Sequence, residues 1–141
     1  PTPARAVLAF DFGLRQIGVA VGNTLLGTTR PLAILKAKEG VPDWLAIEAL
    51  IREWLPDLLV VGEPLNMDGS PSELSARAGK FAGRLHGRLG LPGEMADERL
   101  SSFEAKQESR ARGHGGDFRK EPVDSYAAEL ILQTWLRTNA P

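Results

Sequence analysis

The chain has 141 residues, of which 43% are hydrophobic and 25% are charged, the composition of an ordinary globular domain. This length predicts one domain, spanning 1–141, and excludes an enzyme built from two full domains. The absence of cysteine excludes disulfide frameworks, thiol nucleophiles and zinc sites with Cys ligands. With only two histidines, a bound metal would take mostly carboxylate oxygens as ligands. No apolar run approaches the roughly 18 residues of a membrane helix and no signal peptide opens the chain, so we expect a cytoplasmic protein.

The formal net charge of −1 conceals a strong asymmetry along the chain. Residues 1–38 carry five Lys or Arg and one Asp, and residues 77–121 carry ten Lys or Arg and seven acids. Residues 39–76 carry one Arg and eight acids. A basic face can bind phosphate groups without a basic isoelectric point, although a solvated surface explains the same charges.

The first half of the chain predicts mainly strands. Four apolar runs are typical of buried or half-buried strands: 6–10, 17–21, 29–35 and 58–62. The first run ends at Asp11, and the second is predicted to be its hairpin partner. Pro31 fits an edge strand or a bulge. Asp43 can cap a helix that runs to about Leu55.

The second half predicts mainly helices. Apolar spacing and capping residues favour three of them: 74–89, 102–112 and 124–137. A short strand at 94–96 follows the first helix, and a polar, glycine-containing loop at 113–121 precedes the last. This order of elements predicts an α/β fold, a mixed five-stranded sheet flanked by helices on both faces.

Acidic side chains stand at the ends of the predicted elements. They are Asp11, Glu63, the adjacent pair Asp97 and Glu98, and Asp124. Ligands of open α/β sheets gather near strand ends, and like charges brought together there raise one another's pKa unless a cation is present. Ligands that are all oxygen suit Mg²⁺ or Mn²⁺. Two such ions about 4 Å apart can activate water and stabilise the leaving oxygen in phosphodiester cleavage.

Each acidic position also has a structural interpretation. Asp11 could belong only to a turn, Glu63 to a salt bridge, and Asp124 to a helix cap. Strand alternation would point Asp97 and Glu98 in opposite directions, which would leave only one of them as a ligand. Asp124 shares a helical face with three apolar residues, and this spacing aims it inward: Ala128, Ile131 and Trp135.

Cationic side chains gather on one side of the predicted helix at 74–89. They are Arg77, Lys80, Arg84 and Arg88. Such a row can hold a nucleic-acid backbone through phosphate contacts that carry no sequence information, or it can be a solvated face. Arg15 and Arg99 stand closest in sequence to the acidic positions. They could contact a scissile phosphate or form salt bridges with those same acids.

Four blocks of sequence together resemble the YqgF family. The blocks are DFGLRQIGVAV at 11–21, VVGEPLNMDG at 60–69, DERLSS at 97–102 and VDSYAA at 123–128, with RAGKFA at 77–82 between them. Each block alone is weak, but the match covers nearly the whole chain in order and at similar spacing. The resemblance implies an RNase H-like fold and a metal-dependent nuclease related to Holliday junction resolvases and to nucleases of 16S rRNA precursor maturation.

The same resemblance suggests site residues. Asp11, the pair Asp97 and Glu98, and Asp124 match the acidic positions of the family. Glu63 departs from the family, which more often has an apolar residue there, although related resolvases carry a catalytic Glu near the end of this strand. The middle metal ligand therefore stays open among Glu63, Asp97 and Glu98.

We expect a Mg²⁺- or Mn²⁺-dependent endonuclease that acts on structured nucleic acid, in pre-16S rRNA processing, Holliday junction resolution or both. The alternative is a catalytically weak RNA-binding factor of ribosome assembly that uses the basic helix. Nothing in the sequence separates RNA from DNA as the substrate. Symmetrical cutting of a four-way junction calls for a two-fold dimer. Leu25, Leu26 and Trp135 are the apolar candidates for its interface, although each also suits a core or a lone surface position.

Overall fold

The computed structural model of the protein describes residues 5–100 and 123–139. The strands are β1 (Ala6–Asp11), β2 (Gln16–Asn23), β3 (Thr28–Lys38), β4 (Val41–Pro42), β5 (Leu58–Glu63) and β6 (Gly93–Asp97). The helices are α1 (Trp44–Trp54), α2 (Glu73–Leu89), the short 3₁₀ turn η1 (Glu98–Leu100) and α4 (Val123–Asn139). The helix predicted at 102–112 and the loop predicted at 113–121 lie outside the described residues.

The strands form one mixed sheet in the order β4-β3-β2-β1-β5-β6. β1, β2 and β3 are antiparallel neighbours, whereas β5 is parallel to β1 and β6 is parallel to β5. The predicted α/β class is confirmed, but the described residues form a sheet of six strands where five were predicted. The third strand continues to Lys38, and after a tight turn Val41 and Pro42 pair back onto its end as β4. The register shifts between Val19 and Ala20, beside the position that pairs with Pro31, so this proline lies at a bulge as predicted.

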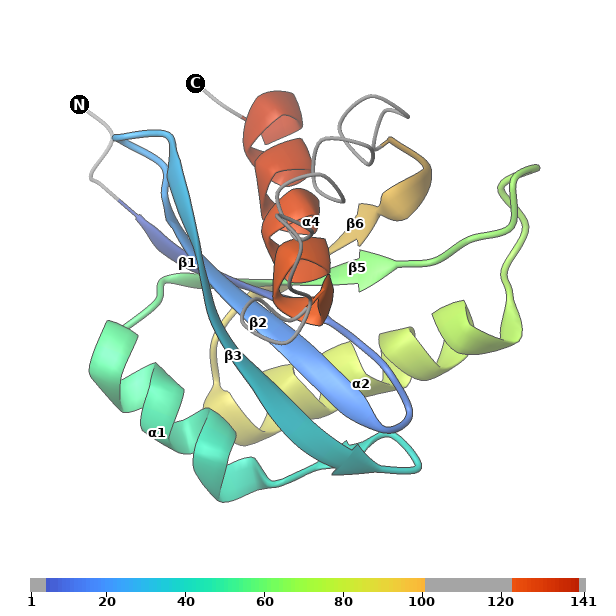
Figure 1. Ribbon diagram of the computed structural model, residues 1–141, viewed down its shortest axis with the longest axis horizontal. Helices are drawn as coiled ribbons and strands as arrows, with labels where there is room; N and C mark the ends of the chain where they lie inside the picture. Colours follow the sequence, from blue (N-terminus) through green and yellow to red (C-terminus); the bar gives the residue numbers. More distant parts are fainter. Residues whose placement is uncertain (1–4, 101–122, 140–141) are drawn as a thin grey trace.

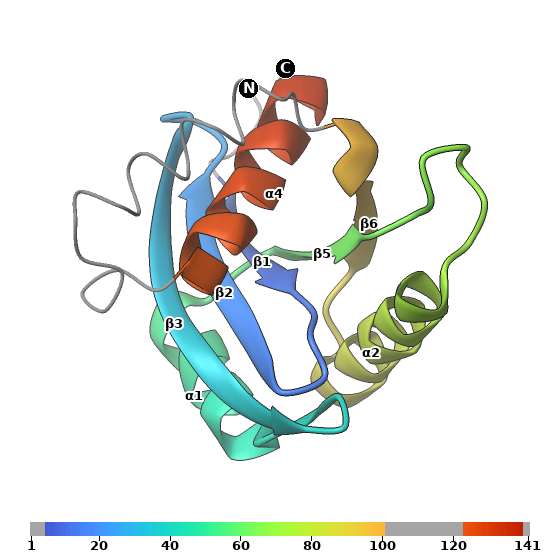
Figure 2. The same cartoon turned by 45° about the vertical axis from the view of Figure 1, so that its right-hand side comes forward.

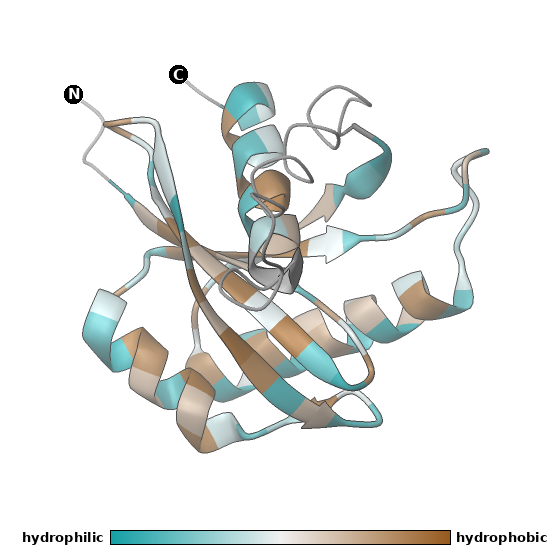
Figure 3. Ribbon diagram, in the orientation of Figure 1, coloured by the Kyte–Doolittle hydropathy of each residue, from teal (hydrophilic) through white to brown (hydrophobic). Residues whose placement is uncertain are grey.

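Helices cover both faces of the sheet, as Figures 1 and 2 show. α1 and α2 pack on one face, where large side chains form the core, among them Phe10, Phe12 and Phe81. Among the described helices, α4 packs on the other face, over a second cluster that contains Ala9, Ala20, Ala96 and Ala128. Alternation along each strand sends successive side chains to these two cores, which explains the continuous apolar runs of β1 and β5. Figure 3 shows the apolar residues in the middle of β2 and β3.

Glycines in the strands allow α4 to approach the sheet closely. A Cβ atom added to Gly62 would lie 2.5 Å from Ile131 Cδ1, and one added to Gly22 would lie 2.8 Å from Leu132 Cδ2. Both distances are shorter than a normal contact between carbon atoms, so these positions need glycine for close packing. The approach fixes α4 against the strand ends that carry the predicted site.

The ends of α1 and α2 are capped, α1 by the residue that the sequence predicts. The Asp43 side chain accepts a hydrogen bond from the Leu45 amide at 3.0 Å and caps α1. Ser72 and Ser75 form a reciprocal capping box at the start of α2, and Gly90 ends that helix with a left-handed φ of 67°. Among the described residues, no helix combines the length and apolarity needed to span a membrane.

Candidate active site

The carboxyl ends of β1, β5 and β6 meet at one edge of the sheet, because these three neighbours are parallel. Each strand ends in an acidic residue, namely Asp11, Glu63 and Asp97. Glu63 and Asp97 are direct register partners. Phe10 pairs with Val61, which puts Asp11 beside Gly62 on strands about 4.8 Å apart. The edge therefore gathers the acidic positions that the sequence predicts at strand ends.

Asp11 and Glu98 lie on the face that α4 covers. Asp11 continues the row of Val7 and Ala9, which pack into the cluster beneath α4. The side-chain carboxyl carbon of Glu98 lies 3.2 Å from the position of a Cβ on Gly62, the point that Ile131 of α4 also approaches. The Glu98 carboxyl group thus stands over Gly62, next to the end of β1. Both Asp11 and Glu98 are half-buried.

Glu63 and Asp97 lie on the opposite face. Val61 and Met95, two residues earlier on the same strands, pack into the core beneath α1 and α2, and alternation puts Glu63 and Asp97 on that side. The neighbours Asp97 and Glu98 therefore do point apart, as predicted. The reason differs in part, because Glu98 begins the 3₁₀ turn η1 and is not a strand residue.

Asp97 forms a salt bridge with Arg99, with 2.8 Å between Asp97 Oδ2 and Arg99 Nη2. The Arg99 amide and Nε also donate to this carboxylate. These bonds, chiefly those from the guanidinium, hold the pKa of Asp97 below its usual value. Of the two interpretations of Arg99, the structure has the salt bridge.

Arg99 also holds the loop between β5 and α2, a role that the sequence does not predict. Its Nη1 donates to the Met67 carbonyl at 3.3 Å, and its guanidinium lies 3.2 Å from where a Cβ on Gly69 would be. Gly69 has a φ of 90°, a conformation that favours glycine, and its lack of a side chain leaves room for the guanidinium. The Asp68-Gly69-Ser70 sequence is typical of a turn, but nothing in it identified Arg99 as the partner.

Asp124 belongs to the first turn of α4, and its side chain lies outside the described residues. The rest of its predicted helical face is buried: Ala128 is 0%, Ile131 3% and Trp135 7% exposed. Trp135 is therefore a core residue, one of the interpretations that the sequence left open, and it is no longer a candidate for a dimer surface. Its Nε1 donates to Glu94 Oε1 at 3.3 Å. Leu25 and Leu26, the other two candidates, are each 70% exposed.

The chemistry of the α4 face suits a hard divalent cation, because Asp11 and Glu98 contribute only oxygen donors. Within the described residues, no three metal-ligating side chains form a cluster. Asp124, the remaining predicted acid, belongs to the start of α4, and its side chain lies outside the described residues.

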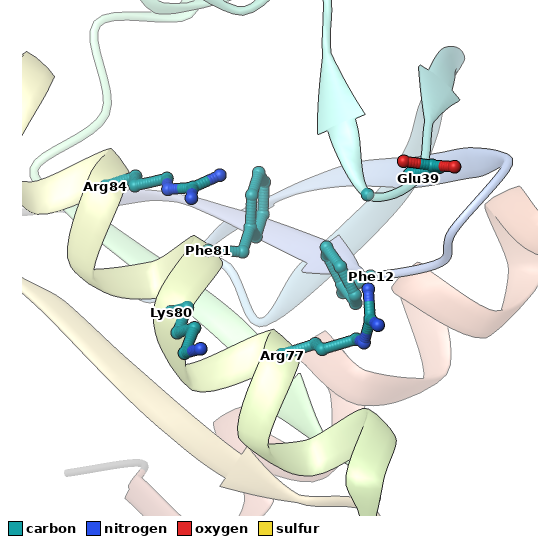
Figure 4. A pocket seen from close by; sticks show the side chains of 7 residues that line it. Phe12, Glu39, Arg77, Lys80, Phe81 and Arg84 are labelled. Carbon is teal, nitrogen blue, oxygen red and sulfur yellow. The ribbon is translucent and has the colours of Figure 1, made fainter.

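The predicted cationic residues of α2 are exposed, but they do not all have the same surroundings. Arg77, Lys80 and Arg84 line a pocket of about 270 Å³ between α2 and the turn at Glu39 and Gly40 (Figure 4). Arg88 instead lies over the Trp44 ring, 4.4 Å from its centre, in a cation–π contact. Arg15 is exposed on the turn from β1 to β2. The Arg15 carbonyl of this turn accepts a hydrogen bond from the Ala37 amide of β3, and the Leu14 carbonyl accepts one from the Gly40 amide in the turn after β3.

Comparison with known sequences finds a family model described as "RuvX: Holliday junction resolvase", which matches residues 5–138. A Pseudomonas putida protein named "Putative pre-16S rRNA nuclease" is 59% identical over 136 residues, 96% of each chain. A protein of the same name from Azotobacter vinelandii is 57% identical and covers 94% of this chain and 93% of its own. These findings confirm the resemblance to the YqgF family inferred from the sequence.

Solved structures with the same fold are also known. One, described as "T. thermophilus RuvC in complex with Holliday junction substrate", has a TM-score of 0.58 at 16% identity and covers 96% of this chain and 97% of its own. The yeast mitochondrial Holliday junction resolvase Ydc2 has a TM-score of 0.52 at 12% identity, with coverages of 93% and 77%. At these identities the likeness shows the RNase H-like fold alone.

Proposed function

This chain belongs to the RuvX family, and we propose that it is a metal-dependent endonuclease that hydrolyses phosphodiester bonds in structured nucleic acid. The observation that carries the proposal is the placement of the Asp11 and Glu98 carboxylates on one face of the sheet edge, beneath α4. The relatives at 57–59% identity, named for pre-16S rRNA, make an rRNA precursor the first substrate to test. We expect the protein to act in the cytoplasm.

Asp11, Glu98 and Asp124 are the residues that we expect to hold Mg²⁺ or Mn²⁺. When bound, one or two such ions supply an activated water and stabilise the leaving 3′-oxygen. The protein itself fixes the two described carboxylates in place. Asp11 ends a fully hydrogen-bonded central strand, and Glu98 starts a 3₁₀ turn directly after β6. Fixed carboxylates need little rearrangement on binding the metal, which favours catalysis.

Glu63 and Asp97 are not metal ligands in this proposal. They are on the face away from α4, and Asp97 already neutralises Arg99. This leaves Glu98 as the middle ligand among the three acids that the sequence left open. Asp97 and Arg99 are positioning residues, because they hold the loop at Met67 and Gly69 against the end of β6.

The cations of α2 and Arg15 are expected to bind the phosphate backbone. Phosphate contacts of this kind position nucleic acid without selecting its sequence, so the structure of the substrate would decide which strand is cut. A homodimer stays a prediction, and the exposed Leu25 and Leu26 at the tip between β2 and β3 are its remaining candidates.

The test is cleavage of labelled pre-16S rRNA fragments, four-way DNA junctions, duplexes and single strands with Mg²⁺, Mn²⁺ or EDTA. Asp11→Asn and Glu98→Gln are each expected to lower the cleavage rate by more than about 100-fold, because even residues that only support metal ligands are worth 10–100-fold. Glu63→Gln is the matched control, since it removes one carboxylate from the same edge but on the other face. Its activity is expected to stay within about threefold of the wild-type protein.

Three results would contradict this assignment. Metal-independent cleavage that survives Asp11→Asn would remove the carboxylates from the mechanism. Binding without cleavage of any substrate, equal in wild type and variants, would favour the alternative of an RNA-binding factor in ribosome assembly. If the cleavage rate of Glu63→Gln fell as far as that of Glu98→Gln, the assignment of different roles to the two faces would be wrong.

A further inference from the structure

A pocket of about 270 Å³ opens between α2 and the turn that joins β3 to β4, on the face of the sheet opposite to α4. Its side-chain lining comes from Phe12, Glu39, Arg77, Lys80, Phe81 and Arg84. Figure 4 shows the cationic side chains along α2 and Glu39 on the turn across from them. The phosphate contacts proposed above for the cations of α2 do not say what this cavity itself binds.

The lining carries three cations and one carboxylate. Arg77 has an ion pair with Glu73, but the distance is 3.8 Å and the Glu73 side chain is 89% exposed, so the pair is weak. In the part of the chain that the structure describes, Lys80 and Arg84 have no carboxylate oxygen within 4.0 Å. The pocket therefore has a positive field that its own walls do not neutralise, concentrated in a concave surface.

The walls of the pocket are held rigidly. Arg77, Lys80 and Arg84 are spaced three and four residues apart on a capped helix, which presents them on one side over two turns. Phe12 and Phe81 form the floor, with ring centres 5.3 Å apart. On the turn, the Gly40 amide donates to the Leu14 carbonyl at 2.9 Å. The elements that line the pocket are already in place, so an anion would order only the cationic side chains when it binds.

We propose that this pocket binds a phosphate group of the substrate strand other than the phosphate that is cut. Arginine and lysine are the side chains that bind phosphate most strongly, through charge-assisted hydrogen bonds. A stacked base is a poorer fit, because Phe81 and Phe12 are only 2% and 7% exposed and offer no free ring face. The inference rests on the proposed nuclease function, since it takes the ligand from the same substrate.

The pocket lies near the proposed metal-binding carboxylates, so a phosphate bound in it can position the substrate strand. Phe12 directly follows Asp11, so the two side chains leave one strand end toward opposite faces. A nucleic-acid strand that crosses the end of β1 can reach the Asp11 side and the pocket at once. The pocket then fixes the distance along the strand from a bound phosphate to the scissile bond, and it sets where the cut falls.

The experiment measures binding in EDTA, where no cleavage occurs, by fluorescence anisotropy of labelled single-stranded and junction oligonucleotides. Each oligonucleotide carries one uncharged methylphosphonate, moved one position at a time. For the wild-type protein we expect one position to weaken binding about tenfold. In the Lys80→Gln/Arg84→Gln double variant that position should have no effect, and the slope of log affinity against log salt should fall by roughly 0.7–0.9.

The matched control is Lys36→Gln/Arg52→Gln, which removes the same two charges from exposed positions away from the pocket. Oligonucleotides with and without a 5′-phosphate distinguish a strand end from an internal phosphodiester as the source of the bound group. The same double variant, tested for cleavage with metal, should cut at shifted or additional positions. Circular dichroism verifies that the variants are folded.

An unchanged methylphosphonate pattern in the pocket variant, or an equal loss in the control, would overturn this inference while leaving the nuclease proposal intact. Failure of wild-type protein to bind any oligonucleotide would overturn it as well. Loss of cleavage in Asp11→Asn together with an intact pattern of interference would separate the two sites. Failure of the proposed function appears only in the cleavage assay, not in the binding scan.

Discussion

The two faces of the sheet carry acidic residues at the same edge, yet their surroundings differ. On the α2 side, Asp97 is joined to Arg99 at 2.8 Å and helps to hold a loop. On the α4 side, the Glu98 carboxyl group stands over Gly62, beside the end of β1 where Asp11 lies, and small residues let the helix approach. Asp97 and Glu98 are neighbours in sequence, yet Asp97 has a structural role and Glu98 has the proposed catalytic one. In the proposed site, the direction of a side chain, more than its residue type, separates the carboxylates assigned to metal binding from those that are not.

The largest effect is expected from filling the space at Gly62. In Gly62→Val, the new Cβ would lie 2.5 Å from Ile131 Cδ1 and 3.2 Å from the Glu98 carboxyl carbon, so both side chains must move, and the added methyl groups crowd them further. Overpacking of this kind lowers the free energy of unfolding by about 1–3 kcal/mol. A displacement of about 1 Å in a catalytic group can lower the rate about 100-fold. Thermal unfolding and the cleavage assay measure the two effects.

The control for this change is Gly87→Ala on α2, where an added Cβ meets nothing within 4 Å. It removes a helical glycine and is expected to raise the free energy of unfolding by about 0.5–1 kcal/mol without changing cleavage. If Gly62→Val kept wild-type activity, the proposed meeting of Glu98 and Asp11 beneath α4 would be wrong.

The sequence predicts the strand ends well, but it cannot predict toward which face of the sheet the acidic side chains point. The apolar runs located β1, β2 and β5, since buried strands need such runs, and the acids after them followed directly. Choosing between Glu98 and Asp97 required the 3₁₀ turn at Glu98 and the close approach of Ile131 to Gly62, both tertiary features. Local patterns contain no information about which helix covers which face.

The pocket illustrates the same limit for binding residues. The cations of α2 were predicted from helical spacing, because three and four residues separate them on one side of the helix. Glu39 and Phe12, which complete the pocket, come from distant turns and have no sequence signal of their own. Arg88, predicted with the same row, contacts Trp44 instead, because the indole ring of α1 lies within its reach.

A smaller effect is expected at the turn that closes the pocket. Gly40 has a φ of 84°, and an added Cβ would lie 2.8 Å from Phe12 Cζ. Gly40→Ala is therefore expected to lower the free energy of unfolding by about 2–3 kcal/mol, from backbone strain and crowding together. Gly27 has a φ of 68° and nothing within 4 Å, so Gly27→Ala should show only the strain, about 1 kcal/mol. Chemical denaturation measures both losses of stability. Equal losses in the two variants would mean that a side chain at position 40 does not crowd Phe12.

The smallest effect concerns the loop on the α2 side and depends on pH. The Asp68 carboxylate accepts hydrogen bonds from the Ser70 hydroxyl at 2.6 Å and the Ser70 amide at 2.8 Å. These bonds, the hydroxyl first, hold its pKa below the usual 3.8. A lowered pKa in the folded state means that the carboxylate stabilises the fold above pH 3.8, and that this contribution is lost as the pH falls through the lowered value.

Titration of the Asp68 carboxyl by NMR should accordingly give a pKa below 3.8 in the wild-type protein. Ser70→Ala removes the hydroxyl donor but keeps the amide donor, so the pKa should rise part of the way back toward 3.8. Amide hydrogen exchange at Asn66 and Gly69, whose amides are bonded within the loop, should quicken in the same variant. Exchange in β5 should not change, because that strand is held by its neighbours and not by the loop. If the pKa of Asp68 were unchanged in Ser70→Ala, the hydroxyl would not be the group that fixes this turn, and Arg99 would have to hold the loop without it.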